Sequence, residues 1–411
     1  MNTLPDKSTQ AIRRRIFRLH PNVFFLGIVS LLTDVSSEMI FTLVPLFLRN
    51  VLGSPTTVVG LVGGISESAD ALFRIVSGWV SDRIGQRKLL AVLGYSISTL
   101  VKPFMYPASS WGAVLAIRFG DRIGKGVRSS SRDALIADSV TASERGRGFG
   151  LHRAMDTTGA VIGLAIAALI VYLVQGGGYQ LERDTYRWMV IIGSIPAALA
   201  VLVLVMMVHE RRGRTAGRNS TDQSAEDRPQ AGLSTRFKVF LGIMVVFTLG
   251  NSSDFFVILR AQDIQAPLIQ VVAMLVLHNI THAAIAMPMG ILSDRMGRKR
   301  VIIIGWTVYA LVYLGFALAT SVWQVWLLFV AYGVYYGVVE GVARAFVADM
   351  VPPEQRGIAY GLYHGVIGLT LLPASVLAGW LWDTVNPAAP FYLGAGLAFV
   401  ALLALITLIR E

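Results

Sequence analysis

The residues with the clearest chemical potential are acidic side chains inside long apolar segments. Asp34 and Glu38 stand four positions apart, which places them on one face of a helix. Glu67 and Asp70 stand three apart on the next segment, and Arg74 follows one turn later. Neighbouring carboxylates in a low dielectric can hold a proton between them, so all four acids are candidates for proton coupling. The alternative is a static lattice of ion pairs, and it applies best to Glu67 and Asp70, which Arg74 can satisfy locally.

A dense row of charges occupies the fourth apolar segment. Five bases and two acids there leave a net positive stripe, which would attract an anionic substrate into a cavity. We predict that Arg118, Asp121 and Arg122 line a substrate cavity, whereas the bases nearer the end of the segment pair with neighbouring acids or reach water. Helical periodicity places seven charged residues in this one stripe: Arg118, Asp121, Arg122, Lys125, Arg128, Arg132 and Asp133.

The second half of the chain is polar in its apolar segments but carries fewer charges. Met274, His278 and His282 form a row at i, i+4 and i+8, which offers metal ligands but lacks the rest of a coordination sphere. We interpret His278 and His282 as residues that line the cavity or relay protons, and Asp254 as a further cavity acid. No cofactor and no resident metal are expected. Aromatic residues of the tenth segment are interpreted as lining or anchoring it: Trp323, Trp326, Tyr332, Tyr335 and Tyr336.

Composition indicates that membrane helices position these residues. Of 411 residues, 54% are hydrophobic and 15% charged, and the mean hydropathy is +0.61, which excludes soluble, secreted and disordered classes. The chain has no cysteine, which excludes disulfides and thiolate metal sites. Apolar runs of about 20 residues match a bilayer core. They predict twelve spans, at about residues 22–48, 57–80, 89–109, 112–139, 147–175, 186–208, 238–262, 268–292, 300–320, 323–349, 357–382 and 388–409.

The positive charges predict the topology. An even number of spans puts both termini on one side, and most of the 36 Lys and Arg lie on that side. By the positive-inside rule the termini are cytoplasmic and the protein is a multi-pass protein of the inner (plasma) membrane. The net charge of +11 is then a topology signal rather than a sign of nucleic-acid binding. The expected partners are a small-molecule substrate, protons and membrane lipid, and the chain is expected to act as a monomer.

An internal repeat divides the chain. The segment GWVSDRIGQRK, which begins at Gly78, reappears 212 residues later as GILSDRMGRKR, which begins at Gly290. Further matches follow in the same order at nearly this offset, so the predicted fold is an all-α membrane protein whose twelve transmembrane helices form two pseudo-symmetric six-helix bundles. The predicted domains are a cytoplasmic N-terminal segment (1–21), an N-terminal bundle (22–208), a cytoplasmic linker (209–237) and a C-terminal bundle (238–411).

The repeated loop resembles the signature loop of the major facilitator superfamily, Gly-x-x-x-Asp-Arg-x-Gly-x-Arg-Lys. Its second copy matches the family at Gly290, Asp294, Arg295, Gly297, Arg298 and Lys299. The first copy departs at Gln86, where the family usually has a basic residue. The resemblance covers the whole chain. Within the superfamily the chain resembles the drug/proton antiporters, and in particular a subgroup with a DRIGKG-type fourth helix. Arg118 falls where many proton-coupled members place an arginine, although Asp121 and Arg122 replace the usual Gln and Gly. The resemblance implies these gating residues: Gly78, Asp82, Arg83, Gly85, Gly290, Asp294, Arg295, Gly297, Arg145 and Arg356.

Together these features predict a secondary active transporter of a small solute, not an enzyme. We expect alternating access and proton coupling, with export of a drug or metabolite favoured over import. The alternatives are a carrier of an anionic or metal-complexed solute and, from a different class, a membrane enzyme or a non-transporting sensor. Pseudo-symmetry further predicts that Asp82 docks near the start of the eleventh span and Asp294 near the start of the fifth, which would close the cytoplasmic side.

Overall fold

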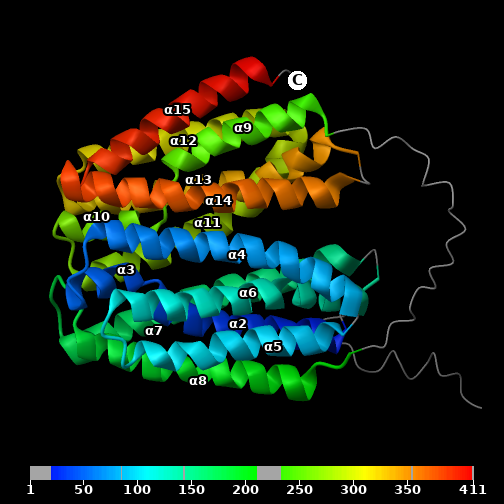
Figure 1. Ribbon diagram of the computed structural model, residues 1–411, viewed down its shortest axis with the longest axis horizontal. Coiled ribbons are helices and arrows are strands. Elements are labelled where there is room, and N and C mark those ends of the chain that lie inside the picture. Colours follow the sequence, from blue (N-terminus) through cyan, green and yellow to red (C-terminus); the bar gives the residue numbers. More distant parts are fainter. Residues whose placement is uncertain (1–19, 85, 142–143, 211–232, 353–354, 410–411) are drawn as a thin grey trace, which may run out of the picture.

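The computed structural model describes residues 20–84, 86–141, 144–210, 233–352 and 355–409, and all regular structure within them is helical. The helices run side by side along one axis (Figure 1). In lipid each backbone N–H and C=O must be bonded within its own segment, which makes the helix the element that these apolar runs adopt. Below, the terminal end is the end where α2 (Pro21–Phe41) begins and α15 (Ala389–Leu408) ends, and the far end is the opposite one.

The chain of the N-terminal half runs along the long axis of the molecule six times. Two of its passes end in short π-helical turns and one in a 3-10 turn. Its elements are α2, α3 (Val44–Leu46) and η2 (Phe47–Val51); α4 (Thr56–Ile84); α5 (Arg87–Val101) and η3 (Lys102–Met105); α6 (Trp111–Ser139); α7 (Arg145–Ile170) and η5 (Val171–Gln175); and α8 (Arg183–Met207).

The chain of the C-terminal half also runs along this axis six times, and the helix of its first pass is interrupted. The sequence predicts a continuous helix over 238–262, but residues 251–253 are not helical and separate two helices. Non-helical backbone at membrane depth is tolerated where it lines a cavity, and these three residues do so. The elements are α9 (Thr235–Gly250) and α10 (Phe255–Asp263), α11 (Leu268–Met296), α12 (Arg298–Leu318), α13 (Val322–Met350), α14 (Arg356–Thr384) and α15.

The passes differ in how apolar they are. Within the described residues, nine are long and apolar enough to cross a membrane on length and composition. The other three, which contain α4, α5 and α6, lie among them in the same bundle (Figure 1). Because α4 and α6 contain many of the charged residues discussed above, their low hydropathy reflects an internal polar surface rather than a soluble segment. The fold is therefore the predicted twelve-helix membrane protein.

The repeat is visible in the helix boundaries. α6 and α13 each have 29 residues, and they are preceded by Ser110 and Ser321, which stand 211 residues apart and both cap a helix N-terminus. The Ser110 hydroxyl accepts a hydrogen bond from the Ala113 N–H, and Ser321 forms a capping box with Gln324. α4 and α11 also have 29 residues each. The duplicated sequence thus specifies duplicated helices.

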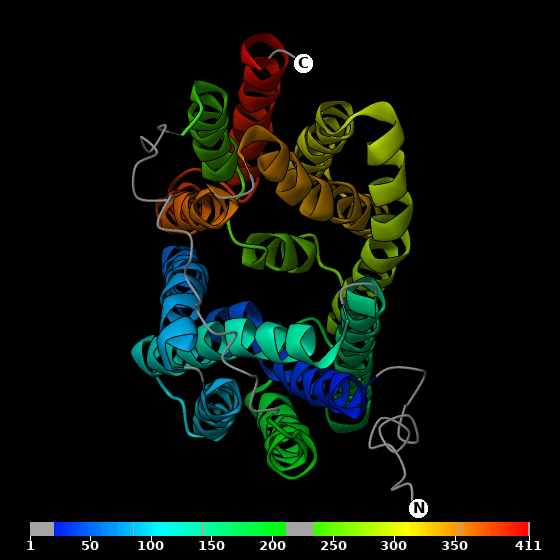
Figure 2. The same ribbon diagram turned by 90° about the vertical axis from the view of Figure 1, so that its right-hand side faces the viewer.

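The two halves face each other and meet closely at the far end. In the view along the helices, α10 lies between them (Figure 2). α4 packs against α14 through glycines that allow backbones to approach, since a Cβ placed on Gly379 would lie 2.6 Å from the Thr56 carbonyl oxygen. The Asp383 carboxylate of α14 accepts hydrogen bonds from the N–H groups of Thr56, at 3.1 Å, and Thr57, at 2.7 Å, and so caps α4 from the other half. These contacts hold the two halves together at the far end.

Candidate functional site

A cavity of about 470 Å³ lies between the two halves. One of its walls comes from α2, α4 and α6, and the other comes from residues 251–253, α10, α11, α13 and α14. A second cavity of about 460 Å³ extends it toward the terminal end. Five residues line both, so the two form one continuous polar space: Asp34, Glu38, Lys125, Arg128 and Asn279.

Asp34 meets an acid that the sequence analysis did not single out. Its carboxyl group lies close to that of Asp156 on α7, and both residues line the second cavity. The Ser30 hydroxyl donates to Asp156 at 2.6 Å, and the Arg153 guanidinium lies 3.6 Å from it. Two carboxyl groups this close repel each other when both are ionised, and they can share one proton. Asp156 is the only acid in the predicted fifth span, 147–175, and this feature could have identified it from the sequence.

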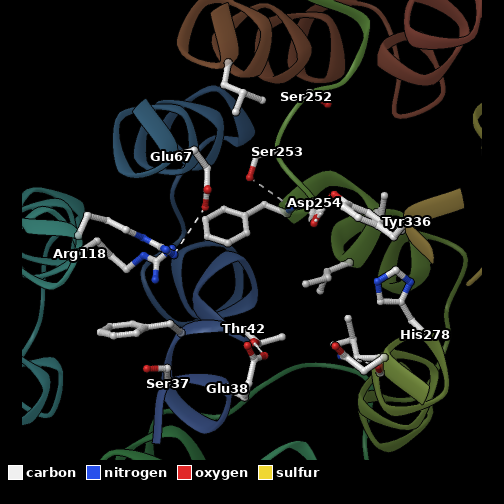
Figure 3. A pocket seen from close by; sticks show the side chains of 18 of the residues that line it. Ser37, Glu38, Thr42, Glu67, Arg118, Ser252, Ser253, Asp254, His278 and Tyr336 are labelled. Atoms are coloured by element: carbon white, nitrogen blue, oxygen red, sulfur yellow. Dashed lines mark hydrogen bonds and ion pairs between the residues drawn. The ribbon is translucent and has the colours of Figure 1, made fainter. Parts of the chain in front are cut away.

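The other acids of the N-terminal half have separate partners. Glu38 lines the cavity one turn after Asp34 and accepts a hydrogen bond of 2.5 Å from the Thr42 hydroxyl. Glu67 lies 3.5 Å from the Arg122 guanidinium, and the contact crosses the upper part of Figure 3. Asp70 pairs with Arg74 at 3.0 Å. Glu67 and Asp70 therefore sit in the ion-pair lattice that the sequence offered as their alternative role.

Arg118 is the most buried base of the α6 stripe. Its side chain is 1% exposed, and its Nε and Nη1 atoms have no hydrogen-bond partner among the described residues. Its guanidinium carbon lies 4.7 Å from the ring centroid of Phe41 and 5.7 Å from that of Phe255, which belongs to the other half. The two rings can stabilise the cation, but they do not satisfy its N–H donors.

The rest of the stripe is more fully bonded. The Ser98 hydroxyl donates to Asp121 and accepts from Arg128, and Arg132 pairs with Asp133 at 3.0 Å. All seven charged residues of the stripe line one or both cavities, as their helical spacing indicated.

Lys102 is a second residue that the sequence analysis missed. It lies in η3, is fully buried, and donates to the hydroxyl groups of Ser36 at 2.9 Å and Ser37 at 3.0 Å. A buried ammonium needs such acceptors and nearby negative charge to offset the loss of hydration. It had a simple sequence signal, since it is a lysine at the end of an otherwise apolar third span.

The wall from the C-terminal half is built on hydroxyl and aromatic groups. The Asp254 carboxylate at the start of α10 accepts hydrogen bonds from Tyr332 at 2.5 Å and Tyr336 at 3.0 Å. Asp254 is exposed to the cavity, which Tyr332, Tyr336 and His278 also line. Figure 3 shows Asp254, Tyr336 and His278 on the side opposite Arg118.

The two histidines have different surroundings. His278 lies between tyrosines, with ring centroids 5.3 Å from Tyr332, and its Nδ1 atom has no hydrogen-bond partner among the described residues. His282 contacts Glu340 at 3.1 Å, and Glu340 also contacts Arg153 of the N-terminal half at 3.3 Å. Glu340 therefore links the two halves on the terminal side of the cavity. No group of three or more His, Asp or Glu gathers to hold a metal ion in the described part of the chain.

Comparison with known proteins identifies the family to which this chain belongs. The sequence model of the Major Facilitator Superfamily matches residues 26–259 and again residues 239–411. The chain belongs to this superfamily. An uncharacterized MFS-type transporter of Methanocaldococcus jannaschii is 35% identical over 389 residues, which cover 93% of this chain and 94% of the relative. The multidrug resistance protein MdtG of Dickeya zeae is 37% identical over 131 residues, which cover 31% of this chain and 32% of that protein.

A solved structure supports the fold. The nucleoside transporter NupG superimposes with a TM-score of 0.76 at 15% identity, over 95% of this chain and 99% of that chain. At that identity the likeness concerns the fold alone. Together with the family, it indicates that the protein is a multi-pass membrane transporter of a small molecule rather than an enzyme.

The superfamily's signature loops are described only in part. Gly85 lies outside the described residues, as do the side chains of Asp82, Arg83 and Arg145, while Gly78 falls on the backbone of α4. In the second copy, Gly297 takes a positive φ of 91° between α11 and α12, which glycine adopts without strain. Asp294 is 71% exposed on its side chain and lies 3.8 Å from Arg298 of the same loop. Arg295 and Arg356 are exposed. Docking of Asp294 at the fifth span stays a prediction for another conformation.

Proposed function

We propose that this superfamily member is a proton-coupled secondary transporter that carries its proton on the Asp34 and Asp156 pair. The observation that supports this is the close approach of their carboxyl groups in one cavity, because neighbouring acids in a low dielectric can share a proton. Both residues line the cavity that continues toward the terminal end, so water can deliver or remove that proton. Glu38 lies one turn from Asp34 in the same space and is the next acceptor toward the centre.

Proton release has a direct route to the contact between the halves. Loss of the shared proton leaves two like charges side by side and strengthens the pull of Asp156 on Arg153, at 3.6 Å. Arg153 also contacts Glu340 of the C-terminal half at 3.3 Å. The same guanidinium thus contacts both the proton site and the C-terminal half. A change of charge at the proton site therefore alters the contact between the two halves. This coupling drives the rocking of the predicted bundles 22–208 and 238–411 in a monomer.

We propose export as the direction. The predicted topology puts the termini in the cytoplasm, so the cavity that extends toward the terminal end receives solute from the cytoplasm, and the far end is closed. The local likeness to a multidrug resistance protein supports the drug/proton antiporter-like assignment, and the DRIGKG-type fourth helix remains part of the proposal. In the opposite, outward-open state, docking of Asp82 and Asp294 closes the cytoplasmic side of the transporter, which lies in the inner membrane.

Everted membrane vesicles test proton coupling. A panel of solutes is added to energised vesicles, and a pH-sensitive dye reports solute-dependent collapse of the proton gradient. We expect Asp34→Asn and Asp156→Asn each to abolish this collapse while solute exchange at equal pH persists. Asp184→Asn is the matched control, because Asp184 is 78% exposed on its side chain and pairs only locally with Arg187. Full gradient collapse in the Asp34→Asn/Asp156→Asn double variant would refute the proton site.

Of the alternatives, a carrier of an anionic solute has one specific observation in its favour, the unpartnered N–H groups of Arg118. A metal-complexed solute has less support, because Met274 is packed in the apolar core and His282 contacts Glu340. Arg118→Gln should weaken the binding of an anionic solute far more than Arg132→Gln, since Arg132 already pairs with Asp133.

A further inference from the structure

We propose that the central cavity binds a zwitterionic small molecule, with its anionic group on Arg118 and its ammonium group on Asp254. The inference rests on the proposed transport function and deepens it by naming the class of substrate. It arises from two charged groups on opposite walls of one cavity, each of which lacks a partner of opposite charge within ion-pair distance in the described part of the chain.

The anionic end follows from how Arg118 is held. Aromatic rings lie over its guanidinium, those of Phe41 and Phe255. The nearby acids have other bonds, because Glu67 contacts Arg122 at 3.5 Å and Asp121 accepts from Ser98. A buried guanidinium with unsatisfied N–H groups is unfavourable until a planar acceptor meets its edge. A carboxylate has that shape and forms two parallel hydrogen bonds with arginine.

The cationic end follows from the surroundings of Asp254. Both of its hydrogen-bond donors are neutral hydroxyl groups, those of Tyr332 and Tyr336. The carboxylate is exposed to the cavity, and aromatic rings flank it. An ammonium group that enters this wall pairs with the carboxylate and also lies near the faces of tyrosine rings, which attract cations. A neutral or anionic group at this place would leave the Asp254 charge uncompensated.

Charge balance favours a ligand with both groups. A simple anion would satisfy Arg118 and leave Asp254 without a cation, and a simple amine would do the reverse. The cavity of about 470 Å³ falls within the usual size of small-molecule sites. Arg118 belongs to the N-terminal half and Asp254 to the C-terminal half, so a zwitterion that reaches both joins the two halves. Phe255, the neighbour of Asp254, already packs on Arg118, so a contact between the two halves lies directly beside the proposed site.

Ligand binding to the purified full-length chain in detergent tests the proposal at one fixed pH. The probes form matched sets: an amino acid such as 5-aminovalerate, its deaminated anion valerate and its decarboxylated cation butylamine. Longer and shorter ω-amino acids, α-amino acids and dipeptides extend the panel, each beside its deaminated and decarboxylated analogue. Thermal stabilisation ranks the probes, and calorimetry gives Kd. We expect at least one zwitterion to bind tenfold or more tightly than both of its analogues.

Two variants then assign the ends. Asp254→Asn should weaken binding of that zwitterion tenfold or more while leaving the Kd of the deaminated anion within twofold. Arg118→Gln should weaken both, and should leave the decarboxylated cation within twofold. This pattern depends on the ligand, so it separates a lost contact from a general loss of folding, which would weaken every probe alike. Thermal unfolding of each variant without ligand serves as the folding control.

The proposal is overturned if no zwitterion in the panel binds more tightly than its two analogues, or if Asp254→Asn weakens the anion as much as the zwitterion. Because binding is measured without a proton gradient, these outcomes do not depend on coupling. Zwitterion binding with no proton flux would refute the proposed coupling alone, and proton flux driven by simple anions or amines would refute the zwitterion alone.

Discussion

The two walls of the central cavity come from duplicated halves, yet they use different chemistry. The wall from the N-terminal half contains four acids and four bases, joined in part by ion pairs such as Glu67 with Arg122. The wall from the C-terminal half surrounds one acid, Asp254, with tyrosine hydroxyl groups and His278. Paired charges resist change because each buried charge depends on its partner, whereas neutral hydroxyl groups exchange partners at lower cost.

This difference assigns separate tasks to equivalent helices. α6 and α13 have equal lengths and matching caps, but the first carries Asp121 and Lys125 where the second carries Tyr332 and Tyr336. The proton chemistry that we propose therefore belongs to the N-terminal half, where neighbouring acids can share a proton. The C-terminal half contributes an adaptable aromatic surface and the interfacial acid Glu340.

The strongest test of the comparison removes one buried polar group from each half. Lys102→Met should lower the free energy of unfolding by about 3–5 kcal/mol, because it deletes a fully buried charge among groups arranged around it. Tyr309→Phe is the matched change in the C-terminal half, where the Tyr309 hydroxyl donates to the Gly250 carbonyl at 3.0 Å. Its loss should cost about 1 kcal/mol. Denaturant unfolding in detergent measures both, and equal losses would remove the distinction between the two halves.

Coupling should depend on the N-terminal acids much more than on the C-terminal one. Asp34→Asn, alone or combined with Glu38→Gln, should reduce pH-driven accumulation about a hundredfold or more, because the shared proton has no site. Glu340→Gln should reduce it only several-fold, because Glu340 is 36% exposed on its side chain and acts through the interface. Accumulation in proteoliposomes under an imposed pH gradient gives both values. Unchanged accumulation in the double variant would end the assignment.

The close contact of the halves at the far end is open to a steric test. Gly379→Val should shift the equilibrium about tenfold away from the state described here, since its side chain meets the backbone of Thr56 and Thr57. Gly396→Val is the control, because a Cβ at Gly396 has no atom within 4 Å. The chain has no cysteine, so single cysteines introduced at the far end report opening by their labelling rate. Equal labelling in the two variants would contradict the role given to this seam.

The smallest expected effect concerns the ion pair that joins the halves near the terminal end. Arg153→Gln removes a contact between side chains that are 56% and 36% exposed. An exposed pair contributes less than about 1 kcal/mol, so the equilibrium between conformations should shift only a few-fold. Labelling of single cysteines on the terminal faces of α6 and α13 measures the shift. A loss of folding in this variant would show that the pair is structural instead of a conformational link.

Much of the fold could be predicted from the sequence because it depends on local and periodic features. Twelve helices in two halves are indicated by the apolar runs, the positions of Lys and Arg and the 212-residue repeat. All three features can be found along the chain without knowing which helices contact each other. The α6 stripe was predictable for the same reason, since spacing along one helix determines which residues share a face. The ion pair of Asp70 with Arg74 follows from the same local rule, as these residues stand one turn apart.

The tertiary structure decided which charges meet across helices. Asp156 becomes a partner of Asp34 only because α7 packs against α2, and Glu340 reaches Arg153 only because the halves face each other. The break before α10, which places Asp254 at the hydroxyl groups of Tyr332 and Tyr336, also depends on neighbours that satisfy the free backbone. The sequence by itself determined the helices and their polar faces, because these follow from the chain and the bilayer. Pairing between helices depends on their relative rotation and depth, which result from packing over the whole bundle.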